Sequence, residues 1–164
     1  MIYEVPDSMK DEDAAGFIIP VHTAYHAVHR RGQVQSGETV LVLGAAGGVP
    51  SSAVQLCAAA GCRVIAVAGG SEKVAFAKEL GANVVIDHRQ EDFAEAVLRE
   101  IGPAAIDAII DFVQGEPCQR ARPLLAVEGR YRSTTTRVIG IEDVPAALRD
   151  LAERRTMGRV VARF

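Results

Sequence analysis

A glycine-rich turn between a short apolar run and a helical pattern is the part of the sequence best suited to chemistry. The run Val40–Leu43 is rich in β-forming residues, and Gly44, Gly47 and Gly48 follow it. Glycine lets a backbone turn sharply and approach a ligand closely. A helical pattern from Ser51 then places free N–H groups and the positive end of a helix at the tip of the strand. This arrangement favours a pyrophosphate, and therefore a nucleotide cofactor.

The spacing of the turn differs from the usual G-x-G-x-x-G, so a turn that only joins a strand to a helix is the alternative. Pro50 stands where a third glycine normally allows close helix–strand contact. Proline is tolerated in a first helical turn, but it removes one N–H that could bind phosphate. We expect Gly47 to adopt a positive φ and the backbone there to approach the pyrophosphate. A branched side chain would block that approach and disfavour the positive φ, so Gly47→Val should abolish nucleotide binding in a folded protein.

The residues after the second apolar run distinguish NAD from NADP. An acid at the end of that strand would bind the ribose 2′-hydroxyl, whereas polar or basic groups would accept a 2′-phosphate. No Asp or Glu ends the run Arg63–Ala68, and Ser71 and Lys73 follow it. Glu72 could favour NAD, although an acid in a first helical turn also suits the helix dipole. The sequence therefore favours NADPH over NADH.

Several histidines could also do chemistry. His88, with Arg89 beside it, follows the third apolar run and could reach the adenosine, although both also suit a solvated loop. His22, His26 and His29 recur at helical spacing. The sequence has no H-E-x-x-H and no nearby cysteine pair, so we interpret these three as histidines of a partly exposed helix.

Other polar residues have simpler interpretations. Asp111 ends the fourth apolar run and could touch the site, but we interpret it as a cap of the following loop. The polar run Ser133–Thr136 is interpreted as a loop. We assign no catalytic residue and no metal ligand. Because nicotinamide carries the hydride chemistry itself, the protein needs mainly to position it.

Helical and strand patterns alternate along the chain. We expect strands at residues 39–43, 63–68, 83–86, 106–111, 129–132 and 159–164. We expect one helix that starts near Ser8, a second from Pro20 to Gly32, a third at 51–60, a fourth at 71–80 with Ser71 as its cap, and others at 91–101, 116–126 and 143–155. This alternation indicates a parallel sheet with helices on both faces, a doubly wound α/β or Rossmann fold. Ligands of such folds lie beyond the carboxyl ends of the strands.

Composition limits the class of protein. The 164 residues suffice for one domain with a core, and no apolar run is long enough to span a bilayer. A formal charge of −3 gives no reason to expect nucleic acid. The N-terminal residues do not resemble a signal peptide. Cys57, Cys62 and Cys118 fit neither a disulfide framework nor a metal spacing, so we expect a cytoplasmic protein.

Four segments together resemble the medium-chain dehydrogenase/reductase superfamily, in particular its zinc-independent NADPH:quinone oxidoreductase branch. They are residues 20–28 (PVHTAYHAV), 37–49 (GETVLVLGAAGGV), 79–87 (ELGANVVID) and 157–161 (MGRVV). The resemblance implies a Rossmann domain that binds NADPH, and reduction of a quinone, enone or other activated carbonyl compound. The family's barrel-like substrate domain is expected to be absent, so that residues 1–164 form a single, abbreviated cofactor-binding domain.

The resemblance also implies which residues bind each part of the cofactor. Those expected at the pyrophosphate are Ala46, Gly47, Gly48 and Val49. Those expected at the adenosine phosphate are Ser71, Lys73 and His88. Phe112 and Val113 match the loop beside the nicotinamide, and Thr23 lies on the helix that faces it.

Two functions stay open from the sequence. The first is an NADPH-dependent oxidoreductase that transfers hydride to a quinone or an activated C=C bond. The second is a non-catalytic nucleotide-binding or regulatory domain that depends on a partner chain, which the missing substrate domain favours. We expect a homo-oligomer or a partner chain, because the strand Arg159–Phe164 would expose an apolar edge. We expect neither a nucleic-acid partner nor a membrane.

Overall fold

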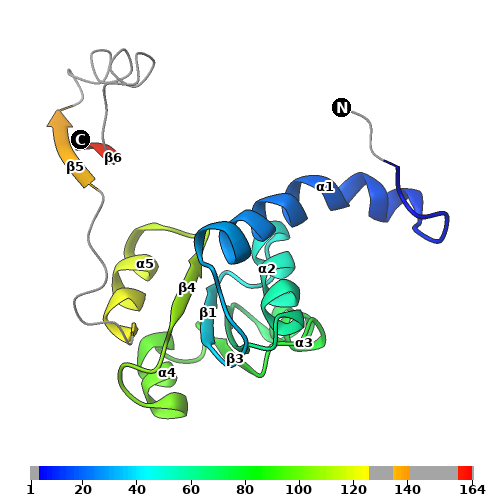
Figure 1. Cartoon of the computed structure of the whole chain (residues 1–164). Helices are drawn as coiled ribbons and strands as arrows, with labels where there is room; N and C mark the ends of the chain where they lie inside the picture. The colour runs from blue at the N-terminus through cyan, green and yellow to red at the C-terminus, as the bar shows by residue number, and fades with distance from the viewer. Residues whose placement is uncertain (1–3, 126–134, 141–158, 164) are drawn as a thin grey trace. The chain divides into compact units, whose positions relative to one another are not determined.

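The computed structural model describes residues 4–125, 135–140 and 159–163 (Figure 1). The chain forms two compact units, Met1–Ala126 and Val127–Phe164. The first unit holds the glycine-rich turn. That all 164 residues form one domain stays a prediction.

A four-stranded parallel sheet lies at the centre of the first unit. Its strands are β1 (Thr39–Leu43), β2 (Arg63–Ala68), β3 (Val84–Asp87) and β4 (Ala108–Asp111), in the order β3-β2-β1-β4. Leu41 of β1 lies opposite Ile65 of β2 on one side and Ile109 of β4 on the other. The order therefore reverses at β1, where β4 returns to the opposite side from β2. This topology confirms the predicted doubly wound, Rossmann-type α/β fold.

Helices cover both faces of this sheet (Figure 1). They are α1 (Asp11–Tyr25), the π-helix η1 (His26–Arg31), α2 (Gly48–Ala59), α3 (Ser71–Glu79), α4 (Phe93–Ile101), α5 (Gly115–Ala121) and the 3-10 turn η2 (Arg122–Leu124). In the part of the chain that the structure describes, no helix is long and apolar enough to cross a membrane.

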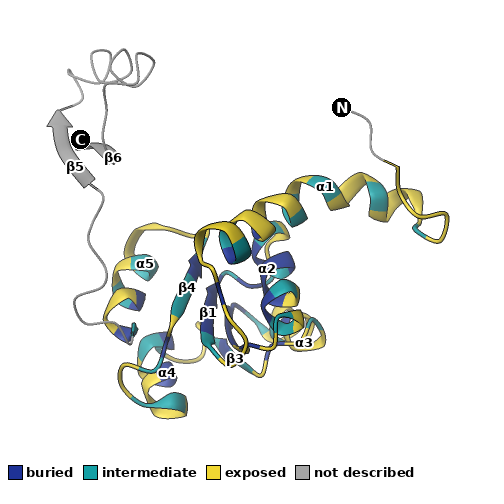
Figure 2. Cartoon of the chain, in the orientation of Figure 1, coloured by how far each residue is buried: buried dark blue, intermediate teal, exposed yellow. Residues whose placement is uncertain are grey.

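Side chains alternate along β1 and divide the core into two layers. Val40 and Val42 join a buried cluster with residues of α1, α2 and α3, whereas Leu41 and Leu43 join a second cluster with residues of α4 and α5. Figure 2 shows the buried residues concentrated in the strands and on the helix faces toward them. An apolar residue at every position of β1 from Val40 on is explained by burial on both faces.

The two cysteines of the first core layer are free thiols. Cys57 and Cys62 are both buried, and burial raises the pKa of the Cys57 thiol to about 12. Cys57 is therefore uncharged at neutral pH and packs as a small apolar residue.

The expected helix break at Pro20 is wrong. Pro20 lies inside the single helix α1, which begins at Asp11 with three acids in its first turn and continues into η1. The proline removes only the N–H that would bond to the Gly16 carbonyl, and Gly16 is exposed to water. The predicted end at Gly32 agrees with the structure, because η1 stops at Arg31.

The cap assigned to Ser71 is also wrong. Gly70 is the N-cap of α3, with φ 93° and ψ 152°, and Ser71 is the first helical residue. A positive φ is accessible to glycine without the clash that a side chain would cause, so the turn is made by the backbone rather than by the serine hydroxyl.

The helix expected at 116–126 ends at Ala121 and is followed by the 3-10 turn η2. The other elements of the first unit follow the sequence within three residues. α2 begins at Gly48 instead of Ser51, and β4 begins at Ala108 instead of Ile106. Ile106 still makes a parallel bridge, to Leu125. Asp107 Oδ2 accepts the Thr39 N–H at 2.8 Å and so ties the start of β1 to the segment before β4.

The described part of the second unit is a parallel strand pair. β5 (Thr135–Gly140) pairs with β6 (Arg159–Arg163). The predicted strand at 159–164 is thus present, but the loop expected at Ser133–Thr136 is wrong for Thr135 and Thr136, whose β-branched side chains suit a strand. The strand expected at 129–132 and the helix expected at 143–155 lie outside the described residues.

Removal of the helix cap at Asp92 tests why α4 begins at Phe93. Asp92 Oδ1 accepts the N–H groups of Ala94 at 2.9 Å and Glu95 at 3.1 Å. Asp92→Ala should lower the free energy of unfolding by about 1 kcal/mol in urea denaturation. Asp92→Asn retains an oxygen acceptor and should lose clearly less. Equal losses would show that the ion pair of Asp92 with Arg120, and not the cap, carries the effect.

Candidate functional site

Two adjoining cavities lie along the carboxyl edge of the sheet. The larger, of about 530 Å³, is lined by the ends of β1 and β2, the loop after β3, the start of α4, and α5. The smaller, of about 270 Å³, is lined by the glycine-rich turn, the turn after β2, and Lys73. Gly44, His88 and Arg89 line both cavities, so the two are neighbours at the place where the strand order reverses.

The glycine-rich turn takes its shape from Gly44. Gly44 has φ 67°, and a Cβ atom placed on it would lie 2.7 Å from Val113 Cγ2. The expected positive φ at Gly47 is wrong, because Gly47 has φ −76° and ψ 163° and serves as the N-cap of α2. The backbone conformation that requires a glycine is therefore found at Gly44. At Gly47 a side chain would be crowded rather than strained, since a Cβ atom would lie 3.3 Å from the Gly44 carbonyl oxygen.

The N-terminus of α2 points two backbone donors at the edge of the sheet. Gly48 and Val49 occupy the first two helical positions, where an N–H has no acceptor inside the helix. Pro50 follows, buried, and Ser51 N donates to the Gly47 carbonyl at 2.8 Å. The structure thus agrees that Pro50 fits the first helical turn and contributes no N–H.

Two positively charged side chains, those of Lys73 and Arg89, line the smaller cavity together with the imidazole of His88. The His88 ring lies against Gly69, where a Cβ atom would come within 2.6 Å of Nε2. Arg89 extends over Gly70, where a Cβ would lie 3.4 Å from Nη1. These groups come from α3 and from the loop after β3, so the cavity has cations on two sides.

Asp87 connects the two turns that form this cavity. Its Oδ1 accepts the Gly70 N–H at 2.9 Å and the Arg89 N–H at 3.0 Å. These hydrogen bonds, the one from Gly70 first, hold the pKa of the Asp87 carboxyl below its usual value. Asp87 was not predicted as a site residue. The available signal was an acid that ends an apolar strand at the carboxyl edge of a parallel sheet.

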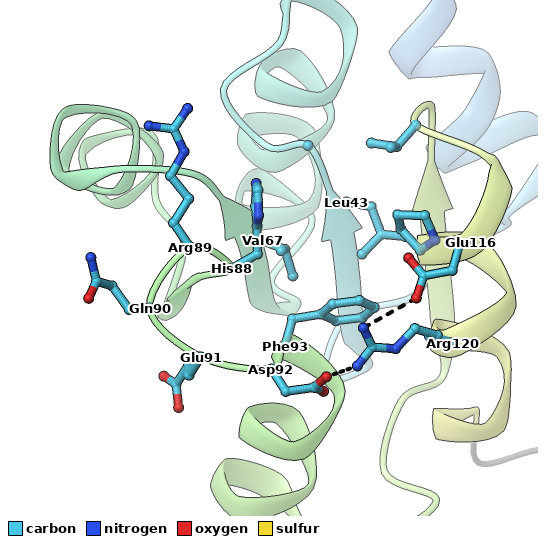
Figure 3. Close-up of a pocket in the computed structure, with 13 residues that line it drawn as sticks. Leu43, Val67, His88, Arg89, Gln90, Glu91, Asp92, Phe93, Glu116 and Arg120 are labelled. Carbon is cyan, nitrogen blue, oxygen red and sulfur yellow. Dashed lines mark hydrogen bonds and ion pairs between the residues drawn. The ribbon is translucent and has the colours of Figure 1, made fainter.

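The larger cavity is lined by both apolar and charged side chains (Figure 3). Leu43, Val67 and Phe93 line it from β1, β2 and α4. Arg120 of α5 also lines it: the guanidinium lies 5.3 Å from the centre of the Phe93 ring and forms an ion pair with Asp92. Phe93 and Arg120 were not predicted, because they come together only when α4 and α5 cover the same face of the sheet.

The loop after β4 is held by Asp111, as the sequence predicts. Asp111 Oδ1 accepts the N–H groups of Val113 at 2.8 Å and Gln114 at 3.0 Å. Phe112 and Val113 are 39% and 50% exposed, which leaves their side chains available for contact with a ligand. A hydrogen bond to Asp111 raises the pKa of the nearby Cys118 thiol.

The structure brings only part of the predicted site residues together. Ala46, Gly47, Lys73 and His88 line the smaller cavity, and His88 and Val113 line the larger one. Gly48, Val49, Ser71, Phe112 and Thr23 line neither of these two cavities. Thr23 is exposed on α1, where its hydroxyl donates to the Ile19 carbonyl at 2.8 Å. The cofactor-binding role of all these residues stays a prediction.

The histidines at helical spacing lie on α1 and η1. The rings of His22 and His26 are 6.4 Å apart, and the His29 ring lies 4.8 Å from Tyr25. Within residues 4–125, 135–140 and 159–163, no group of three or more His, Cys, Asp or Glu side chains is arranged to hold a metal ion.

Strand order, glycine-rich turn and helix N-terminus together define a Rossmann-type domain. A family model described as zinc-binding dehydrogenase matches residues 48–157, so the chain belongs to this family. The expected membership of the medium-chain dehydrogenase/reductase superfamily, on its quinone oxidoreductase-like side, is confirmed.

Two curated proteins and one solved structure illustrate the similarity. A phenolphthiocerol/phthiocerol polyketide synthase of Mycobacterium tuberculosis is 33% identical over 131 residues, which are 80% of this chain and 6% of the synthase. Quinone oxidoreductase of Homo sapiens is 32% identical over 129 residues, 79% of this chain and 39% of that protein. The apo crystal structure of JamJ enoyl reductase superposes with a TM-score of 0.68 at 23% identity, covering 98% of this chain and 65% of that one. The chain therefore spans less than two thirds of each of these proteins.

Alanine at two glycines tests the shape of the turn. Gly44→Ala should lower the free energy of unfolding by about 1–3 kcal/mol, because it places a side chain at positive φ and against Val113. Gly48→Ala is the matched control: a Cβ there meets only Pro20 Cγ at 3.9 Å, in a helical position that suits alanine. It should leave stability unchanged or slightly raise it in urea denaturation. Equal losses would contradict the distinction between the two glycines.

A strained residue after β4 gives a second stability test. Gln114 has φ 63° and ψ −169°, a region that side chains disfavour. Gln114→Gly should raise the free energy of unfolding by about 1 kcal/mol. The relief of backbone strain outweighs the greater conformational entropy of glycine in the unfolded chain. Gln114→Ala keeps the Cβ atom and should change stability little. If glycine destabilises the protein, the turn does not store strain.

Proposed function

We propose that this chain is the cofactor-binding part of an NADPH-dependent oxidoreductase that transfers hydride to a quinone or an activated C=C bond. The observation that carries the proposal is the cavity beside the glycine-rich turn, which the cations Lys73 and Arg89 line together with His88. A cavity with positive charge from two elements suits a phosphate group, and the neighbouring helix N-terminus suits a second one. A dinucleotide with a 2′-phosphate has both.

In this proposal each part of the cofactor has its own residues. The pyrophosphate lies at the N–H groups of Gly48 and Val49, and the 2′-phosphate lies in the smaller cavity. The adenine ring occupies the larger cavity, whose apolar walls at Leu43, Val67 and Phe93 suit a flat, partly apolar base.

The acids near the site do not favour NADH in this arrangement. β2 ends in Ala68, and Glu72 is exposed and lines neither cavity. Asp87 is near, but one of its oxygens already accepts two backbone N–H groups. The charged residues that line the smaller cavity and could meet the ribose 2′ position are the cations Lys73 and Arg89, which supports NADPH.

The hydride step itself belongs to the nicotinamide, and the chain's task is to position that ring. Val113, packed against Gly44, and Phe112 are held by the turn that Asp111 stabilises, and we assign them to the nicotinamide side together with Thr23. The similarity to a protein named quinone oxidoreductase supports this reaction class.

Two lysines of α3 provide a matched test of cofactor choice. Lys73 and Lys78 are both exposed on this helix, but only Lys73 lines the smaller cavity, and Lys78 lines neither. By isothermal titration calorimetry, the chain should bind NADPH more tightly than NADH. Lys73→Ala should weaken NADPH by about 1–3 kcal/mol and leave NADH almost unchanged, while Lys78→Ala should change neither. Equal losses for both cofactors in Lys73→Ala would contradict the assignment.

Turnover is measured separately from binding. The loss of NADPH absorbance with benzoquinone and with a small enone should report hydride transfer by the full chain. NADPH binding without turnover of either substrate would remove the catalytic part of the proposal and leave a nucleotide-binding domain.

A further inference from the structure

We infer that Asp87 is a positioning residue for cofactor specificity. Its side chain holds the turn after β2, which leads into α3 and Lys73, and the turn after β3, which carries Arg89, at the spacing that accepts a 2′-phosphate. The inference rests on the proposed NADPH function and adds to it a residue that itself need not touch the cofactor. Its basis is the pair of hydrogen bonds that one carboxylate oxygen receives from Gly70 and Arg89.

Asp87 lies where the two turns meet. It ends β3 directly opposite Ala68, which ends β2. The Gly70 N–H comes from the turn after β2, and the Arg89 N–H comes from the turn after β3. His88 N adds a third link by donating to the Ala68 carbonyl at 3.0 Å. The side chain of Asp87 is the part of this junction that a substitution can remove.

Each of the two turns positions one cation of the smaller cavity, Lys73 after the first turn and Arg89 in the second. Gly70 is the N-cap of α3, so its position sets where the first turn of that helix, with Lys73, is placed. The backbone N–H of Arg89 donates to the Asp87 carboxylate, which holds Arg89 and the preceding His88 in place. Loss of the Asp87 side chain would leave only the backbone link from His88 to Ala68 between the two turns, and Lys73 and Arg89 could then move apart.

This separation matters for NADPH and not for NADH. A 2′-phosphate gains from charge-assisted hydrogen bonds only while cations from both turns reach it together. The ribose 2′-hydroxyl of NADH is uncharged, so it gains little from the two cations. The pyrophosphate, which both cofactors have, would lie at the N-terminus of α2. The expected signature is therefore a change in the ratio of the two affinities rather than a general loss of binding.

The charge of Asp87 is not what the inference requires. A carboxylate near a phosphate costs Coulomb energy, which the two N–H donors and the neighbouring Arg89 offset. An asparagine side chain offers an oxygen to the same two donors without the negative charge. Asp87→Asn should therefore preserve the preference for NADPH or increase it, which separates a positioning role from an electrostatic one.

The test compares three variants of the full chain by calorimetry with NADPH and NADH. Asp87→Ala should reduce the preference for NADPH about tenfold, the effect of one charge-assisted hydrogen bond, with NADH affinity nearly unchanged. Asp87→Asn should keep the wild-type preference or exceed it. Asp107→Ala is the control, because Asp107 also accepts a backbone N–H, from Thr39 at 2.8 Å, at the opposite end of the sheet. It should leave the preference unchanged even if stability falls.

Hydrogen exchange of the Gly70 and Arg89 amides gives a readout that needs no ligand. Both amides should exchange faster in Asp87→Ala than in the wild type and Asp87→Asn. If Asp87→Ala does not fold, Asp87→Ser, whose hydroxyl is too short to reach both donors, takes its place in both measurements.

The outcomes separate the two claims. A wild-type chain without preference for NADPH would overturn the proposed cofactor and the specificity role together. A wild-type preference that survives in Asp87→Ala, or that is lost equally in Asp87→Asn, would overturn the role of Asp87 alone. Faster amide exchange in Asp87→Ala with an unchanged preference for NADPH would also overturn the role of Asp87, because its hydrogen bonds would then hold the two turns without affecting cofactor choice.

Discussion

Parallel pairing of β1 with β2 on one side and with β4 on the other is the constraint on which the rest of the site depends. Leu43 lies opposite Val67 and Asp111, so the strands end at one edge and their following turns must converge there. Parallel strands require crossovers, and these place α2 and α3 on one face and α4 and α5 on the other. Both cavities result from this convergence, since each is bounded by turns that are distant in the sequence.

Aspartate side chains then fix the turns. Asp87 ends β3, and one of its oxygens accepts a backbone N–H from the turn after β2 and another from the turn after β3. Asp111 ends β4, and one of its oxygens accepts two N–H groups from the loop beyond that strand. Asp92 does the same for the first turn of α4. Backbone donors that leave a regular strand need an acceptor, and a short carboxylate at the strand end supplies one without another element. The loops that would contact a ligand are thereby held before any ligand arrives.

The sequence predicted the features that depend on local patterns. β1 and β2 have the predicted bounds because their apolar runs are short, buried on both faces and flanked by glycine. It failed at Pro20, since a long exposed helix tolerates the loss of one N–H, and at Gly47, since the apolar pattern does not reveal which glycine takes the positive φ. The contacts of Asp87 with Gly70 and of Arg120 with Phe93 join segments far apart in the chain, and no local pattern indicates them.

The central claim is that the carboxyl edge of this sheet binds NADPH with its 2′-phosphate between Lys73 of α3 and the turn after β3 that carries Arg89. A crystal structure of the chain soaked with NADPH tests it most directly. We expect the pyrophosphate at the N–H groups of Gly48 and Val49, and the 2′-phosphate within hydrogen-bond distance of Lys73 and of Arg89 or His88. NADPH bound elsewhere, or bound at this edge with its 2′-phosphate directed into solvent, would contradict the account.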